Sequence, residues 1–113
     1  MISIPSATMA HITRLLTTAM ADAEQRLSKT QDPLRDIATF RERLHYVNQI
    51  MQEALENAKL NPRHSPNAYQ TIEFLHDMQQ KLTQAEEIKR EFTLLVEIQA
   101  VKTISFQPNA LTT

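Results

Sequence analysis

The sequence predicts an all-α protein in which two long antiparallel helices form a hairpin and an additional helix precedes them. Three observations support this three-helix or coiled-coil-like arrangement. The chain contains no glycine, which disfavours tight hairpin turns and other glycine-dependent loops. Apolar residues recur at alternating three- and four-residue intervals over residues 37–58, as they do in bundle helices. A segment with two prolines, residues 61–67, then separates this stretch from a second one. With 113 residues, the chain is expected to form a single domain, 1–113.

We expect the first helix to span residues 7–28. Its apolar stripe is narrow and rich in alanine, so it allows close packing but buries little apolar area. The stripe consists of Met9, Ile12, Leu16, Ala19, Ala23 and Leu27. Residues 1–8 are small, apolar or hydroxylated, and we expect them to be loosely held.

We expect the second helix to span residues 33–60. Asp32 can accept hydrogen bonds from the free amides of the first turn, and Pro33 suits the first helical position. The apolar seam is the most regular in the chain and consists of Ile37, Phe40, Leu44, Val47, Met51, Ala54 and Ala58. The helix is expected to end at Leu60, because Asn61 and Pro62 disfavour its continuation.

The third helix is expected over residues 66–101. Ser65 and Pro66 repeat the start signal, and the short connection before them favours an antiparallel neighbour. We expect its seam to consist of Ala68, Leu75, Met78, Leu82, Ala85 and Phe92.

The end of the third helix leaves an alternative open. Apolar residues from Phe92 to Phe106 occupy even positions, which is the period of a strand, and many are β-branched. Residues 1–4 offer the one candidate partner strand. A helix as far as Val101 is therefore preferred, an extended segment over 92–106 is the alternative, and residues 107–113 are expected to be a flexible tail.

The charge and composition exclude several functional classes. Twelve basic and thirteen acidic residues are interspersed, which is unlike the footprint of a nucleic-acid binder. The absence of cysteine excludes disulfides and thiolate chemistry. No apolar run approaches the roughly 20 residues that a membrane-spanning helix needs. We therefore expect no nucleic-acid partner and no transmembrane segment, with a small helical regulator of a transcription factor or nucleic acid as the alternative function.

Two Glu-x-x-His pairs could in principle hold a metal ion, because this spacing places both side chains on one face of a helix. They are Glu42 with His45 and Glu73 with His76. In the predicted register all four residues face outward, away from the seam. We therefore expect no metal site, no cofactor and no catalytic residue, and interpret the chain as non-enzymatic.

The apolar end of the third helix is the candidate binding surface. A helix segment that is apolar on all sides must be covered, and one short alanine-rich helix cannot cover it. We expect the surface to consist of Phe92, Leu95, Val96, Ile98, Val101 and Ile104. The pattern does not distinguish a second copy of the chain from a different protein partner.

Residues 49–104 resemble the small helical hairpins of bacterial type III secretion systems, namely the needle and inner-rod subunits. Asn61-Pro62-Arg63-His64-Ser65-Pro66 stands where these subunits have a proline-bracketed polar loop, and an apolar stretch near the C-terminus follows. The resemblance implies an assembly component of a secretion system. The extra N-terminal helix and the polar tail depart from the subunit pattern, and a helical chaperone of the same machinery is the related expectation. The chain is expected in the cytoplasm, with export that needs no cleaved signal peptide as a further expectation.

Overall fold

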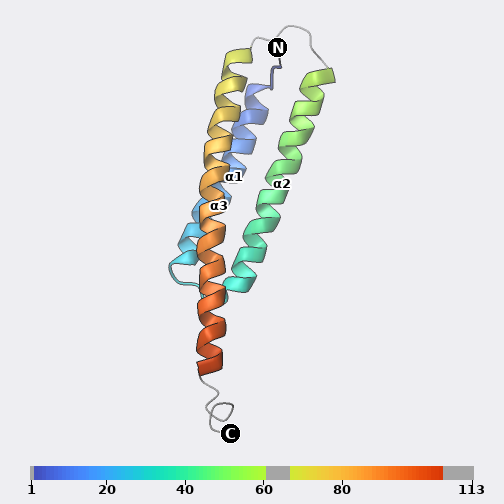
Figure 1. The fold of residues 1–113 in the computed structure, drawn as a ribbon. Coiled ribbons are helices and arrows are strands. Elements are labelled where there is room, and N and C mark those ends of the chain that lie inside the picture. Colours follow the sequence, from blue (N-terminus) through green and yellow to red (C-terminus); the bar gives the residue numbers. More distant parts are fainter. Residues whose placement is uncertain (1, 61–66, 106–113) are drawn as a thin grey trace.

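The chain forms three helices that pack side by side as an elongated bundle (Figure 1). The computed structural model describes residues 2–60 and 67–105, with side chains as far as Thr103. The helices are α1 (Ser6–Leu27), α2 (Pro33–Leu60) and α3 (Ala68–Ser105), and each packs against the other two. These residues contain no strand, so the predicted all-α fold class is confirmed. The expected tail, 107–113, and the connection over 61–66 lie outside the described residues.

The predicted cap of α2 is present, and a further side-chain contact lies at the end of α1. The backbone amide of Arg35 donates a 3.2 Å hydrogen bond to Oδ1 of Asp32, so Asp32 caps α2. Ser28 closes α1 by donating a 2.9 Å hydrogen bond from its hydroxyl to the carbonyl of Gln25. These contacts satisfy polar groups that the helices themselves leave unpaired.

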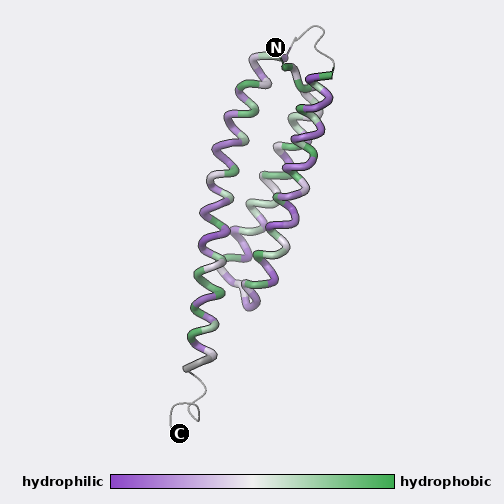
Figure 2. The backbone as a smooth tube through the Cα atoms, turned by 45° about the vertical axis from the view of Figure 1, so that its right-hand side comes forward, coloured by the Kyte–Doolittle hydropathy of each residue, from purple (hydrophilic) through white to green (hydrophobic). Residues whose placement is uncertain are grey.

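The core lies between the three helices, and the seams of α1 and α2 supply most of it. Figure 2 shows hydrophobic and hydrophilic residues alternating along all three helices, as amphipathic helices require. The buried residues of α1 and α2 include Met9, Ile12, Leu16, Ala19, Met20, Ala23, Ile37, Phe40, Leu44, Val47, Ala54 and Ala58. Because α1 packs along both α2 and α3, this short helix covers more of the hairpin than its narrow stripe predicts.

The register of α3 differs from the predicted seam. Thr71, Phe74 and Ile88 are buried, whereas Leu75 and Leu82 are half-buried. One row of core positions on α3 therefore passes through Phe74 and Ile88 rather than through Leu75 and Leu82. This one-residue shift brings Ile88 into the core and leaves Lys89 half-buried beside it.

Residues 2–5 are held against the bundle, so the prediction of a loosely held start is wrong for them. Ile4 is fully buried, and its amide donates a 2.9 Å hydrogen bond to Oγ1 of Thr71. The backbone amide of Asn67 donates to Oγ of Ser3 at 3.3 Å, and its side-chain amide donates to the carbonyl of Ile4 at 3.4 Å. Asn67 also accepts a 2.8 Å hydrogen bond at its carbonyl from the amide of Thr71, which begins α3 just after the predicted Pro66.

The last part of α3 is helical as far as Ser105, so the extended alternative is wrong for the described residues. Nε2 of Gln99 donates a 3.2 Å hydrogen bond to the carbonyl of Gln31, in the connection between α1 and α2. Beyond that contact α3 continues past the end of the other two helices (Figure 1). Residues 100–103 are exposed there.

Candidate protein-binding surface

Three large aliphatic side chains lie exposed on one face of the C-terminal third of α3. Leu94, Ile98 and Val101 are 56%, 49% and 62% exposed. Their spacing of four and three residues places them above one another on a helix. We name these three residues the α3 patch. Because most of their apolar surface faces solvent, the α3 patch is the clearest candidate for contact with another molecule.

The six predicted binding residues differ in their exposure to solvent. Phe92 has no exposed surface and belongs to the core, which corrects its assignment to the binding surface. Leu95 and Val96 are half-buried, whereas Ile98 and Val101 are exposed as expected. The side chain of Ile104 lies outside the described residues. The predicted set lacks Leu94, although its spacing from Ile98 and Val101 could have identified it.

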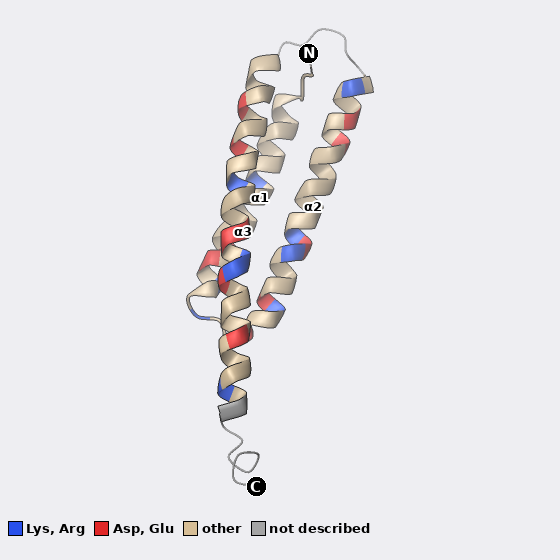
Figure 3. Cartoon of the chain, viewed as in Figure 1, with Lys and Arg blue, Asp and Glu red and all other residues tan. Residues whose placement is uncertain are grey.

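Charged side chains border the α3 patch at both ends. Glu97 and Lys102 line a shallow hollow of about 470 Å³ together with the three aliphatic residues. Glu91 lies one turn before Leu94 and is exposed. None of these three charged groups forms a salt bridge with another described residue. Figure 3 shows charged residues thinly spaced along the last turns of α3.

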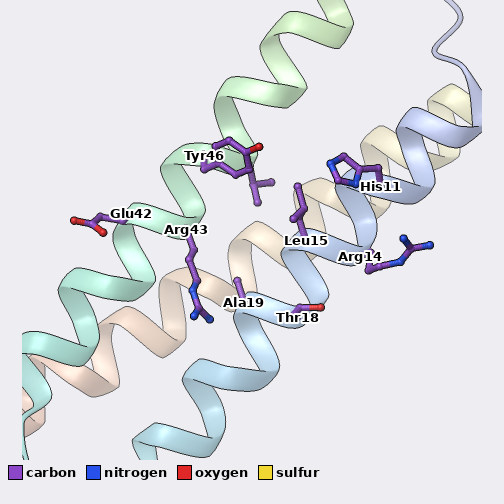
Figure 4. A pocket seen from close by; sticks show the side chains of 9 residues that line it. His11, Arg14, Leu15, Thr18, Ala19, Glu42, Arg43 and Tyr46 are labelled. Atoms are coloured by element: carbon purple, nitrogen blue, oxygen red, sulfur yellow. The ribbon is translucent and has the colours of Figure 1, made fainter.

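A second hollow, which the periodicity of the sequence does not reveal, lies between α1 and α2. Its volume is about 530 Å³, and we name it the α1–α2 groove. It is lined by His11, Arg14, Leu15, Thr18 and Ala19 of α1 and by Glu42, Arg43, Tyr46 and Val47 of α2. Figure 4 shows Leu15 and Tyr46 extending from the two helices into the space between them, while Glu42 points away from α1. The α1–α2 groove is therefore mainly apolar at its centre and polar along its edges.

An ion-pair network joins α1 and α2 at one end of the α1–α2 groove. Oδ2 of Asp22 accepts hydrogen bonds from Nε of Arg26 and from an Nη atom of Arg43, each at 2.9 Å. Arg26 also donates a 3.1 Å hydrogen bond to Asp36 on α2, whose carboxylate is bonded by the hydroxyl of Thr30 as well. The bond to Asp36, and then the bond to Asp22, raise the pKa of Arg26. This network holds Arg43 beside the groove.

The two Glu-x-x-His pairs do not come together. Glu42 and His45 are exposed on α2, and Glu73 and His76 are exposed on α3, which agrees with their predicted outward positions. No three potential metal ligands among histidine, aspartate and glutamate gather within the described part of the chain. Nε2 of His76 instead lies 3.3 Å from the side-chain amide of Gln80, its neighbour on the same helix.

The fold and these two surfaces define a small all-helical protein with an unpartnered apolar helix end. No helix in residues 2–60 and 67–105 is long and apolar enough to cross a membrane. No family model, curated protein or solved structure matches the chain.

Proposed function

We propose that this chain is a non-enzymatic helical interaction protein that binds another polypeptide through the α3 patch. The observation that carries the proposal is the exposure of Leu94, Ile98 and Val101 on one face of a helix that extends past the rest of the bundle. Covering large aliphatic groups on one helix face with an amphipathic partner lowers the free energy, because their apolar surface is removed from water. In this proposal the charges at Glu97 and Lys102 select the partner and the apolar residues supply the affinity.

Within this class, we infer that the chain serves as an assembly component or chaperone of a bacterial protein secretion system. The basis for this step is the resemblance of residues 49–104 to the helical hairpins of type III secretion. An accessible helix end suits either role, because both require contact with another polypeptide that is made and broken without covalent chemistry.

Genetic replacement in the bacterium that encodes the chain tests the proposal. Removing the chain should stop the export of secreted substrates into the medium, and the wild-type chain should restore it. The Ile98→Asp variant should fail to restore export, because a carboxylate cannot be buried unpaired at an apolar contact. Ile72→Asp is the matched control, since Ile72 is a similarly exposed isoleucine at 56% near the opposite end of α3.

Unchanged export after removal of the chain would contradict the assignment to a secretion system. Full restoration by Ile98→Asp would contradict the assignment of the α3 patch as the binding surface. Circular dichroism of both purified variants establishes that a loss of export does not result from unfolding.

A further inference from the structure

We propose that the α1–α2 groove of one copy of this chain binds the α3 patch of a second copy. This inference rests on the proposed function, since it uses the same α3 patch, and it identifies one partner as the chain itself. It also assigns a binding role to α1, the helix by which the chain departs from the hairpins of secretion systems.

The size and lining of the α1–α2 groove suit aliphatic side chains from a helix. A cavity of about 150 Å³ is enough to hold a benzene molecule. The groove, at about 530 Å³, has room for more than one aliphatic side chain. Leu15, Ala19 and Val47 form an apolar floor, and Ala19 leaves space that a larger residue would fill. Tyr46, which is 53% exposed, can close over an inserted group, and tyrosine is a frequent anchor residue in protein interfaces.

A separate hollow lies further along the seam between α1 and α2, which favours an elongated occupant. This smaller hollow, of about 210 Å³, lies between the start of α1 and the end of α2, and the buried residues Ala54 and Ala58 are part of its lining. On α2 these alanines are seven and eleven positions beyond Val47, so they lie on the same side of the helix. A helix, rather than a compact small molecule, matches two hollows that follow one another along a helix pair.

The charges of the two surfaces are complementary. The α1 side of the groove carries His11 and Arg14, and residues 1–21 contain no acidic residue. Arg43 lies on the α2 side, where it is paired with Asp22, while Glu42 points away from α1 (Figure 4). The α3 patch is bordered by Glu91 and Glu97, with Lys102 at its far end, and none of the three has an ion-pair partner among the described residues. Docking the patch into the groove therefore brings carboxylates towards the guanidinium group of Arg14, which promotes association and fixes its orientation.

Pairing two unlike surfaces has a distinct consequence for assembly. A head-to-tail contact between unlike surfaces leaves one patch and one groove free on the dimer. Where two chains do not make the contact reciprocally, association should therefore continue beyond two chains as the concentration rises. A contact between two α3 patches would stop at a dimer instead.

Mixing two defective variants tests this inference. Ile98→Asp damages the patch but leaves the groove intact, and Tyr46→Glu places a carboxylate in the groove but leaves the patch intact. Each variant alone should remain at the 13.0 kDa mass of one chain in light scattering, with association weakened about tenfold or more. An equal mixture should form a complex of two chains and no larger species, because one undamaged pair of surfaces remains.

Matched controls for both variants are available near the start of α3. Tyr69→Glu and Ile72→Asp alter exposed residues of the same types near the start of α3, and both variants should associate like the wild type. Leu94→Asp and Arg14→Glu form a second pair of defective variants, in case one of the first pair does not fold.

Each result other than the expected one overturns the inference in an identifiable way. A wild-type chain that remains at 13.0 kDa at every concentration excludes a second copy as the occupant, and the proposed function still stands on export. A mixture that forms no complex, while the wild type associates, shows that like surfaces pair. Wild-type association by Ile98→Asp shows that self-association uses another surface and overturns this inference, whereas the proposed function is still decided by the export of substrates.

Discussion

The backbone amide of Ile4 donates a 2.9 Å hydrogen bond to Oγ1 of Thr71, which lies 67 positions further along the chain. Both residues are buried, so this contact stands in a region that water does not reach. It fastens the segment before α1 to the first turns of α3. The proposed groove depends on this attachment, because it fixes the start of α1 relative to the other helices.

Replacement of Thr71 by valine should destabilise the fold. The valine side chain matches the shape of threonine but has no hydroxyl, so the amide of Ile4 is left buried and unpaired. Such a loss costs about 1–3 kcal/mol in free energy of unfolding, measurable by urea denaturation. Thr71→Ser, which keeps the hydroxyl, should lose less. Thr83→Val is the exposed control, and an equal loss there would show that the bond to Ile4 is not the cause.

The role of Ile4 could not be predicted from periodicity. Apolar residues every three or four positions predict a helix, whereas a single isoleucine before Pro5 belongs to no repeating pattern. Its burial depends on the hydrogen bonds that Asn67 donates to Ser3 and to the carbonyl of Ile4. These bonds join residues far apart in the sequence, so they require the three helices to be packed together. The seams of α1 and α2, by contrast, follow directly from their spacing.

Phe92 and Leu94 should behave in opposite ways when shortened to alanine. Phe92 has no exposed surface, and the loss of a buried phenylalanine side chain costs about 3–5 kcal/mol in stability. Leu94 is mostly exposed, so its replacement should change the free energy of unfolding by about 0.5 kcal/mol or less. Thermal or urea denaturation of the two variants compares them directly. Similar losses in both would place Leu94 in the core.

The register of α3 explains why the candidate surface was predicted only in part. The predicted seam passes through Leu75 and Leu82, whereas the buried residues Phe74 and Ile88 belong to a seven-residue series that lies one position earlier. Phe92 belongs to the series of Met78 and Ala85, which the shift does not affect, and Leu94 lies on the exposed face. When a helix is apolar on several sides, its own sequence does not show which of its apolar residues are buried. The positions of the neighbouring helices decide this. The α1–α2 groove depends likewise on two helices at once.

Replacement of Asp22 by asparagine should weaken the junction between α1 and α2, most strongly at low salt. Asp22 binds both Arg26 and Arg43, and its partly exposed position leaves these pairs open to screening. The midpoint of urea denaturation should fall at low salt, and the difference should shrink at about 1 M salt, where the Debye length is roughly 3 Å.

Glu24→Gln is the control for this experiment, because Glu24 is exposed on α1 and forms no salt bridge with another described residue. An equal effect of Asp22→Asn at low and high salt would show that packing, and not charge, is responsible.

The raised pKa of Arg26 means that its contribution to stability is present below the ordinary pKa of arginine and disappears only above it. Arg26 itself should therefore cause no loss of stability between neutral and mildly alkaline pH.

A proline at position 100 should separate the end of α3 from the rest of the fold. Ala100 lies beyond Gln99, whose side chain makes the hydrogen bond to Gln31, and the residues that follow are exposed. Proline removes the hydrogen bond to the carbonyl of Val96 and clashes with that turn, which breaks a helix interior. The helical signal in circular dichroism should fall slightly and the denaturation midpoint should remain close to that of the wild type. Association should be lost, because Val101 is no longer aligned with Leu94 and Ile98.

Ala100→Ser is the control, because serine keeps the helix, and this variant should associate normally. A proline variant that still associates would show that Val101 is dispensable for binding.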